Sequence, residues 1–166
     1  ELTNPDIAPR LFTFAANTPV NDVDGGPDHT APAGGHGWDF IGTQANPNLA
    51  PDNDPSDFGG HGTLVTGVLG AAWNNGVGGA GIAPNARVLA VRSCWPNDDC
   101  FQNVQAVATT WAAQQGVRVV STSWLVGPFD GAGCDTAIKN ATNTLFVTIP
   151  SGNGGAADAE GDAVNR

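Results

Sequence analysis

The sequence predicts an α/β domain in which a parallel sheet is covered by helices on both faces. From His61 onward, segments with helical apolar spacing alternate with short apolar runs of the kind that form buried strands. The connections between them are short, which is typical of a parallel sheet covered by helices. The chain has 166 residues and an apolar fraction of 40%, so we expect one globular domain with a substantial core.

Residues 1–60 are expected to be the loop-rich N-terminal part of this domain. They are rich in Pro, Gly, Asn and Asp and show no sustained periodicity, which favours long surface loops. Two apolar pieces, Arg10–Phe14 and Trp38–Ile41, interrupt these loops. Residues 61–166 are the part in which helices and strands alternate.

The stretch GGHGTLVTG places His61 among glycines, just before an apolar run. Apolar residues then recur at helical spacing, so we expect His61 in the first turn of a helix. These residues are Leu64, Val65, Val68, Leu69 and Ala72. The internal glycines each lower helix propensity by about 1 kcal/mol, which is tolerable only where close packing requires small residues. Free space around the imidazole suits an acid–base group that meets a substrate, and a plain loop histidine is the alternative.

Five further elements continue the alternation. They are a strand at 86–91, a helix at 102–115 stopped by Gly116, a strand at 117–124, a weaker helix at 130–140 and a strand at 144–149. In sheets of this kind, sites form beyond the carboxyl ends of the strands. Asn153 follows the last of these strands and His61 opens the first helix, so both could face one crevice.

Charge and composition exclude several functions. Sixteen acidic residues against six basic ones give a net charge of −10, which argues against binding to nucleic acid or to anionic membrane surfaces. No apolar run approaches the roughly 18 residues of a membrane span. The chain begins with Glu1 and contains no methionine, so we expect a processed product or a fragment.

The three cysteines cannot all pair with one another. Cys94 and Cys100 flank a turn-like segment and could close a short loop, which would leave Cys134 free or paired outside the chain. Three unpaired thiols are the alternative.

Several motifs, in this order, resemble those of the subtilisin-like serine peptidases (subtilases). They are ELTNPDI at the start, His61-Gly62-Thr63 opening a glycine-containing helix, NNGVGGAGIAPNARVLAVR from Asn74, Ser123-Trp124 closing a strand, and Ser151-Gly152-Asn153-Gly154 closing the next. The resemblance covers nearly the whole chain. It implies the three-layer subtilisin-like fold, incomplete at both ends, and an internal fragment of the catalytic domain of a serine endopeptidase.

The resemblance also implies the roles of individual residues. His61 matches the histidine that takes the proton from the serine hydroxyl and hands it to the leaving amine. Asn153 matches the asparagine that stabilises the oxyanion. The residues that would line the substrate cleft, where a peptide adds as an extra strand, are Ser123, Trp124, Leu125 and Gly127.

The chain departs from the family pattern at three places. Leu125 stands where the family usually has glycine, and its side chain could narrow the pocket for the residue before the scissile bond. Leu64 replaces a frequent second histidine, and Pro150-Ser151 replaces small alanines. Substrate preference cannot therefore be carried over from the family.

Calcium is the ion that the resemblance implies, as a structural cofactor. Hard cations take six to eight oxygen ligands, often including backbone carbonyls from a glycine-rich loop. The matching set is the Asp6 carboxylate, Asn75, and the carbonyls of Trp73, Val77 and Gly79. The acidic stretch Asn21–His29 lacks the glutamate of an EF-hand loop, so we expect a solvated loop there.

The nucleophile is missing from the printed sequence. The family's serine lies in a Gly-Thr-Ser motif, which this chain does not contain. The catalytic aspartate would fall before Glu1, and Asp24 is a weaker substitute. We therefore expect the 166-residue chain alone to be inactive, and the parent protein to be extracellular and to act on peptides or proteins, with its own pro-segment as a further partner.

Two other functions remain open at this level. A non-catalytic relative that only binds peptides is favoured by Leu125, and the intact histidine and oxyanion motifs argue against it. A calcium-dependent structural or adhesive module is suggested by the acidity and by the loops rich in Asp, Asn and Gly.

Overall fold

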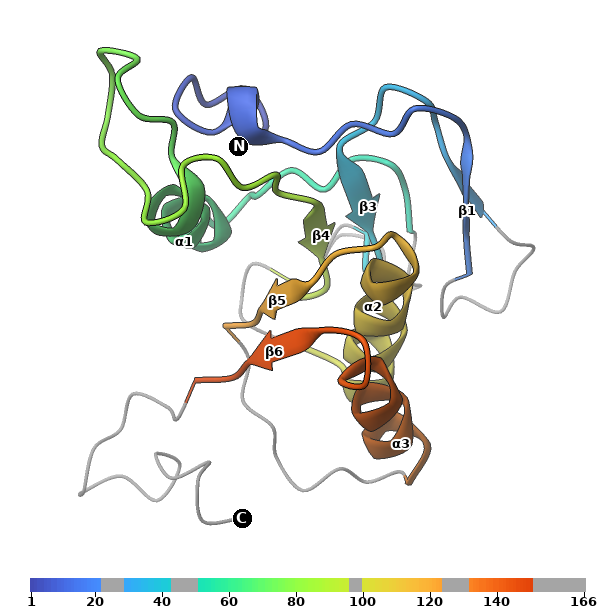
Figure 1. The fold of residues 1–166 in the computed structure, drawn as a ribbon. Helices are drawn as coiled ribbons and strands as arrows, with labels where there is room; N and C mark the ends of the chain where they lie inside the picture. The colour runs from blue at the N-terminus through green and yellow to red at the C-terminus, as the bar shows by residue number, and fades with distance from the viewer. Residues whose placement is uncertain (22–28, 43–50, 96–99, 124–131, 151–166) are drawn as a thin grey trace. The chain divides into compact units, whose positions relative to one another are not determined.

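The computed structural model describes residues 1–21, 29–42, 51–95, 100–123 and 132–150, with backbone alone for 132–135. The chain forms two compact units, Glu1–Asp99 and Cys100–Arg166. In Figure 1 the first unit runs from blue to green and the second from yellow to red.

The described residues of the first unit form a short 3₁₀ helix, four strands and one α-helix. They are η1 (Ala8–Arg10), β1 (Thr18–Val20), β2 (His29–Ala31), β3 (Gly37–Asp39), α1 (His61–Gly70) and β4 (Ala90–Arg92). β1 pairs with β2 antiparallel, whereas β3 pairs with β4 in parallel, with Trp38 opposite Val91. A Cβ atom at Gly37 would lie 1.7 Å from the Ala90 carbonyl oxygen, so this close strand pairing requires glycine at that position.

The described part of residues 1–60 is not surface loop throughout. This part contains β1, β2 and β3 and contributes a large share of the buried side chains. Strands of three residues are too short to produce a periodic signal, and their proline and glycine content hides them. The two apolar pieces become core. Their buried apolar members are Leu11, Phe14, Trp38, Phe40 and Ile41.

Helix α1 begins at His61, as predicted, and ends at Gly70. Ala72, the last residue of the predicted apolar run, therefore lies outside the helix. Among the described residues its apolar side chains are largely uncovered, with Leu64 73% and Val68 63% exposed. Close packing was expected to explain the glycines of this helix, and it does so at Gly70. This residue is buried, and an added Cβ atom would lie 3.4 Å from the Val88 side chain.

The second unit contains α2 (Gln102–Gln114), β5 (Val119–Ser121), α3 (Ala132–Ala141) and β6 (Phe146–Thr148). β5 and β6 are parallel, with Val120 opposite Val147, and α2 packs against α3 (Figure 1). The predicted helices and strands are thus confirmed with small changes at their ends. Gly116 follows α2 with a φ of 77°, which is the left-handed conformation of a helix stop.

The predicted α/β class with parallel strand pairing is confirmed. In the described part of the chain the strands form separate two-stranded sheets, β1–β2, β3–β4 and β5–β6. None of the helices described there is long and apolar enough to span a membrane. Cys94 and Cys100, for which the sequence left a short disulfide loop and free thiols both open, are disulfide-bonded.

Candidate active site

His61 is the first residue of α1, and its side chain is exposed. Gly60 precedes it with a φ of 81°, in the left-handed region that favours glycine. The turn therefore explains one of the glycines around the histidine. Within the described residues the imidazole makes no hydrogen bond, so the backbone of this turn fixes only where the side chain begins.

Asp57 holds the turn that carries His61. Its carboxylate accepts hydrogen bonds from the backbone N–H groups of Gly59 at 3.0 Å, Gly60 at 2.7 Å and Thr63 at 2.6 Å. The first N–H groups of a helix have no partner inside the helix, and a carboxylate satisfies them while it also favours the helix dipole. Asp57 thus caps α1 on both sides of His61 in the sequence.

The lowered pKa of the Asp57 carboxyl agrees with this capping role. Partial burial raises the pKa of its carboxyl, but the hydrogen bonds from Thr63, Gly60 and Gly59 outweigh burial and lower the pKa below its ordinary value. Sequence reasoning missed this residue because a capping side chain is normally sought immediately before the helix. The usable signal was an aspartate followed by a Gly-Gly turn before the histidine.

The predicted calcium ligands are partly brought together in the first unit. The Asp6 carboxylate accepts hydrogen bonds from Asn75 Nδ2 at 2.7 Å and from Gly79 N–H at 2.8 Å, and Asn75 Oδ1 accepts the Val77 N–H at 3.3 Å. Hydrogen bonds from Asn75 and then Gly79 lower the pKa of Asp6. The indole Nε1 of Trp73, a residue predicted to contribute its carbonyl, donates to the Gly81 carbonyl at 2.7 Å.

The backbone of this loop is wound closely around Asp6. Asn74, Gly76 and Gly78 have φ values of 58°, 75° and 51°, all left-handed. A Cβ atom at Gly78 would lie only 1.9 Å from Asp6 Oδ2. The described residues contain no cluster of three His, Cys, Asp or Glu side chains suited to a metal. A cation here would depend on Asp6, Asn75 and backbone carbonyls, which is an oxygen donor set that Ca²⁺ accepts.

The predicted cleft and oxyanion residues are mostly not placed by the structure. Ser123 is exposed and follows β5 in the second unit. The remaining predicted residues lie outside the described part of the chain. These are Trp124, Leu125, Gly127, Asn153 and the substitute acid Asp24.

The described site consists of an exposed histidine that opens α1 in a domain with parallel strand pairs. The model of the Subtilase family matches residues 3–165, and the chain belongs to this family.

Three relatives illustrate the similarity. The chain is 35% identical over 165 residues to the thermophilic serine proteinase of Bacillus sp. (strain AK1). The aligned region covers 92% of the chain and 37% of that protein. It is 37% identical over 122 residues to thermitase of Thermoactinomyces vulgaris, covering 72% of the chain and 40% of thermitase. The crystal structure of MycP1 with its N-terminal propeptide removed shares the fold, with a TM-score of 0.54 at 24% identity, covering 87% of the chain and 45% of MycP1.

The chain therefore spans well under half the length of the curated relatives it matches.

Proposed function

We propose that the protein containing this chain is a serine endopeptidase and that His61 is its catalytic base. The observation that carries the proposal is the position of His61. It lies exposed on the first turn of α1, with its backbone fixed by the Asp57 cap, in a chain that belongs to the Subtilase family. An exposed imidazole on a backbone fixed in this way can meet both a nucleophile and a leaving group.

In the proposed reaction, His61 takes the proton of a serine hydroxyl as that oxygen attacks the peptide carbonyl. It then gives the proton to the departing amine. Asn153 donates a hydrogen bond to the oxyanion that forms on the carbonyl oxygen. Ser123, Trp124, Leu125 and Gly127 line the cleft in which the peptide lies as an added strand.

The nucleophile is not supplied by the 166 residues, which contain no Gly-Thr-Ser triplet. We therefore expect this stretch alone to bind peptides without cleaving them.

Calcium is proposed as a structural cofactor. Asp6, Asn75 and the carbonyls of Trp73, Val77 and Gly79 would hold it, and the described contacts of Asp6 with Asn75 and Gly79 support this set. When bound, the ion would supply positive charge that draws these oxygens together.

An extracellular location, a peptide or protein substrate and a pro-segment as partner complete the proposal. The disulfide-bonded state of Cys94 and Cys100 supports secretion, because such bonds persist mainly in oxidising compartments. The net charge of −10 supports neither nucleic acid nor an anionic membrane as a partner.

Peptide hydrolysis by the full-length protein tests the proposed activity. We expect cleavage of casein that a serine-directed fluorophosphonate blocks, and a fall below about one thousandth of the rate in His61→Ala. His29→Gln is the matched control, since His29 lies on β2 and is not part of the turn that carries His61, and it should retain the parent rate. Full activity of His61→Ala would contradict the proposal.

A second candidate is a non-catalytic relative that binds peptides only. Leu125 favours it, because the family usually has glycine at that place. Saturable binding of a labelled peptide by the full-length protein, with no turnover and no fluorophosphonate labelling, would select this candidate.

A further inference from the structure

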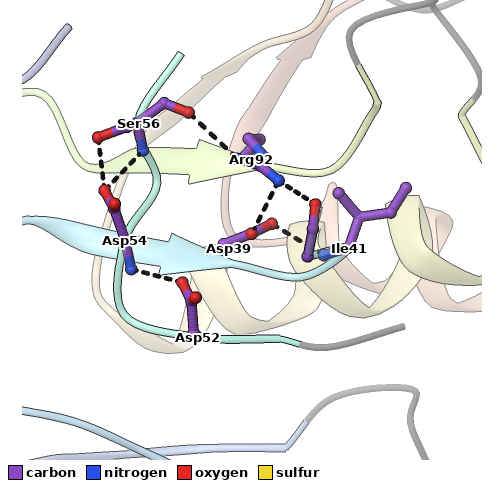
Figure 2. A network of polar contacts seen from close by, with 7 residues as sticks. Asp39, Ile41, Asp52, Asp54, Ser56 and Arg92 are labelled. Atoms are coloured by element: carbon purple, nitrogen blue, oxygen red, sulfur yellow. Dashed lines mark hydrogen bonds and ion pairs between the residues drawn. The ribbon is translucent and has the colours of Figure 1, made fainter. Parts of the chain in front are cut away.

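Arg92, at the end of β4, is the centre of a polar cluster in the first unit (Figure 2). Its Nη2 lies 3.0 Å from Asp39 Oδ2 and also donates to the Gly42 carbonyl. Its Nη1 donates to the Ser56 carbonyl at 3.3 Å. The guanidinium carbon lies 4.7 Å from the centre of the Phe58 ring, in cation–π geometry. One side chain therefore joins the end of β3 to the segment before α1.

The segment 52–58 is held at its start as well. Asp39 and Asp52 exchange backbone hydrogen bonds of 2.9 and 3.0 Å. Within the segment, the Asp52 carboxylate accepts the Asp54 N–H at 2.8 Å, and the Asp54 carboxylate accepts the Ser56 N–H at 3.1 Å (Figure 2). The segment is thus a chain of short turns with anchors at both ends.

The two contacts of Arg92 with this segment flank Asp57. Ser56 and Phe58 are its direct neighbours in sequence, so Arg92 contacts the chain on both sides of Asp57. The Asp57 carboxylate binds the N–H groups of Gly60 and Thr63 on either side of His61. A continuous set of contacts therefore connects Arg92 to the backbone that carries the imidazole.

The Arg92–Asp39 pair is almost free of solvent, with side chains 11% and 2% exposed. Away from water the two charges are screened little, and removal of either partner leaves an unpaired buried charge. The planar guanidinium can serve a carboxylate, carbonyl oxygens and an aromatic ring at once. A lysine ammonium, as a point charge, cannot match that set.

We propose that Arg92 is a positioning residue for His61, acting through segment 52–58 and the Asp57 cap. The proposal rests on the proposed function of His61 as catalytic base. Arg92 contacts the anchors of the turn and not the imidazole, so its effect is on the placement of the base rather than on the chemical step itself.

Arg92→Lys is the decisive variant, and it is tested in the full-length protein. Lysine can keep the charge pair with Asp39 and so preserve the fold, while it loses the shared contacts with Ser56 and Phe58. We expect kcat to fall roughly ten- to a hundredfold, because small misplacements of a catalytic group carry costs of this size. KM should stay within about twofold, since the cleft is not altered.

Arg87→Met is the matched control. Arg87 precedes β4, and its guanidinium donates to the Leu11 carbonyl at 3.3 Å, away from segment 52–58. Its kcat and KM should remain within about twofold of the parent values. Phe58→Leu removes only the stacked ring and should lower kcat in the same direction as Arg92→Lys, by a smaller factor.

A readout independent of activity separates this inference from the proposed function. Amide hydrogen exchange at Gly60 and Thr63 should be faster in Arg92→Lys, and the NMR signals of the His61 ring should shift, with neither change in Arg87→Met. If the parent protein cleaves no peptide, the proposed function fails, and these signals still decide the role of Arg92. Unchanged exchange and ring signals in Arg92→Lys overturn the inference, whatever the value of kcat.

Discussion

The Asp57 carboxylate accepts the backbone N–H of Thr63 at 2.6 Å, so an acid outside α1 binds the third residue of the helix. The distance along the chain is longer than in the usual cap, because the Gly59-Gly60 turn lies between the acid and the helix. The cap and the exposed imidazole are therefore parts of one local structure.

Removal of this cap should destabilise the first unit. Asp57→Ala is expected to lower the free energy of unfolding by about 1 to 2 kcal/mol, because the N–H groups of the first turn lose their acceptor. Asp57→Asn keeps an oxygen acceptor and should cost only part of that. Urea unfolding of both variants measures the difference, and equal losses would contradict capping as the cause.

Two glycines in the loop around Asp6 should respond differently to alanine. Gly76 and Gly78 both have left-handed φ values, 75° and 51°, so either substitution costs about 1 kcal/mol or more in backbone strain. Only at Gly78 would the new Cβ meet Asp6, at 1.9 Å, whereas nothing lies within 4 Å at Gly76. Gly78→Ala should therefore lower the melting temperature clearly further than Gly76→Ala, as differential scanning calorimetry can show.

Calcium should stabilise the folded protein through Asp6. At a concentration about a hundred times the dissociation constant, an ion that binds only the folded state adds about 2.7 kcal/mol. The melting temperature should rise on addition of calcium and fall again with a chelator. Asp6→Asn should remove most of this response, and Asp54→Asn, an acid outside the loop, should keep it. A calcium response of parent size in Asp6→Asn would exclude the proposed ligand set.

Asp39 should impose a pH dependence on stability. Burial raises the pKa of its carboxyl from 3.8 to about 6, against the lowering effects of the Ile41 N–H and of Arg92. Between these values the folded chain binds more protons at this site than the unfolded chain. The contribution of Asp39 to the free energy of unfolding therefore decreases as pH rises through this window and is constant above it.

The substitution Asp39→Asn removes this pH-dependent contribution, because the amide does not titrate. Urea unfolding from about pH 4 to about pH 8 measures the free energy of unfolding of the parent and of Asp39→Asn. The parent value minus the variant value should decrease up to about pH 6 and stay constant above it. A difference that increases over the same range would show that the ion pair with Arg92 outweighs burial.

Much of the fold could be predicted from the sequence where the pattern is long. Helix α2 gives more than three turns of regular apolar spacing and a glycine stop, and its bounds were predicted within one residue. The start of α1 at His61 was predicted for a similar reason. β1 and β2 were missed, since three residues carry no period and their pairing depends on segments that are distant in sequence.

The candidate site was predictable only in part. His61 and the calcium ligands around Asp6 were predicted by resemblance and stay predictions, although the structure does bring Asp6 into contact with Asn75 and Gly79. Arg92 was not found, because its importance depends on contacts with Asp39 and Ser56, residues that precede it by tens of positions. Neither periodicity nor a motif can report such a contact.

The hydrogen bond from Gly79 to Asp6 has a consequence for how the protein folds. It joins residues 73 positions apart and so closes a loop that contains β1, β2, β3 and α1. Native contacts of such long sequence separation slow folding, because much chain entropy is lost before they form. Folding of the first unit should therefore be slower than expected from its helix content, and an ion that bridges Asp6 and Asn75 would act on the unfolding rate more than on the folding rate.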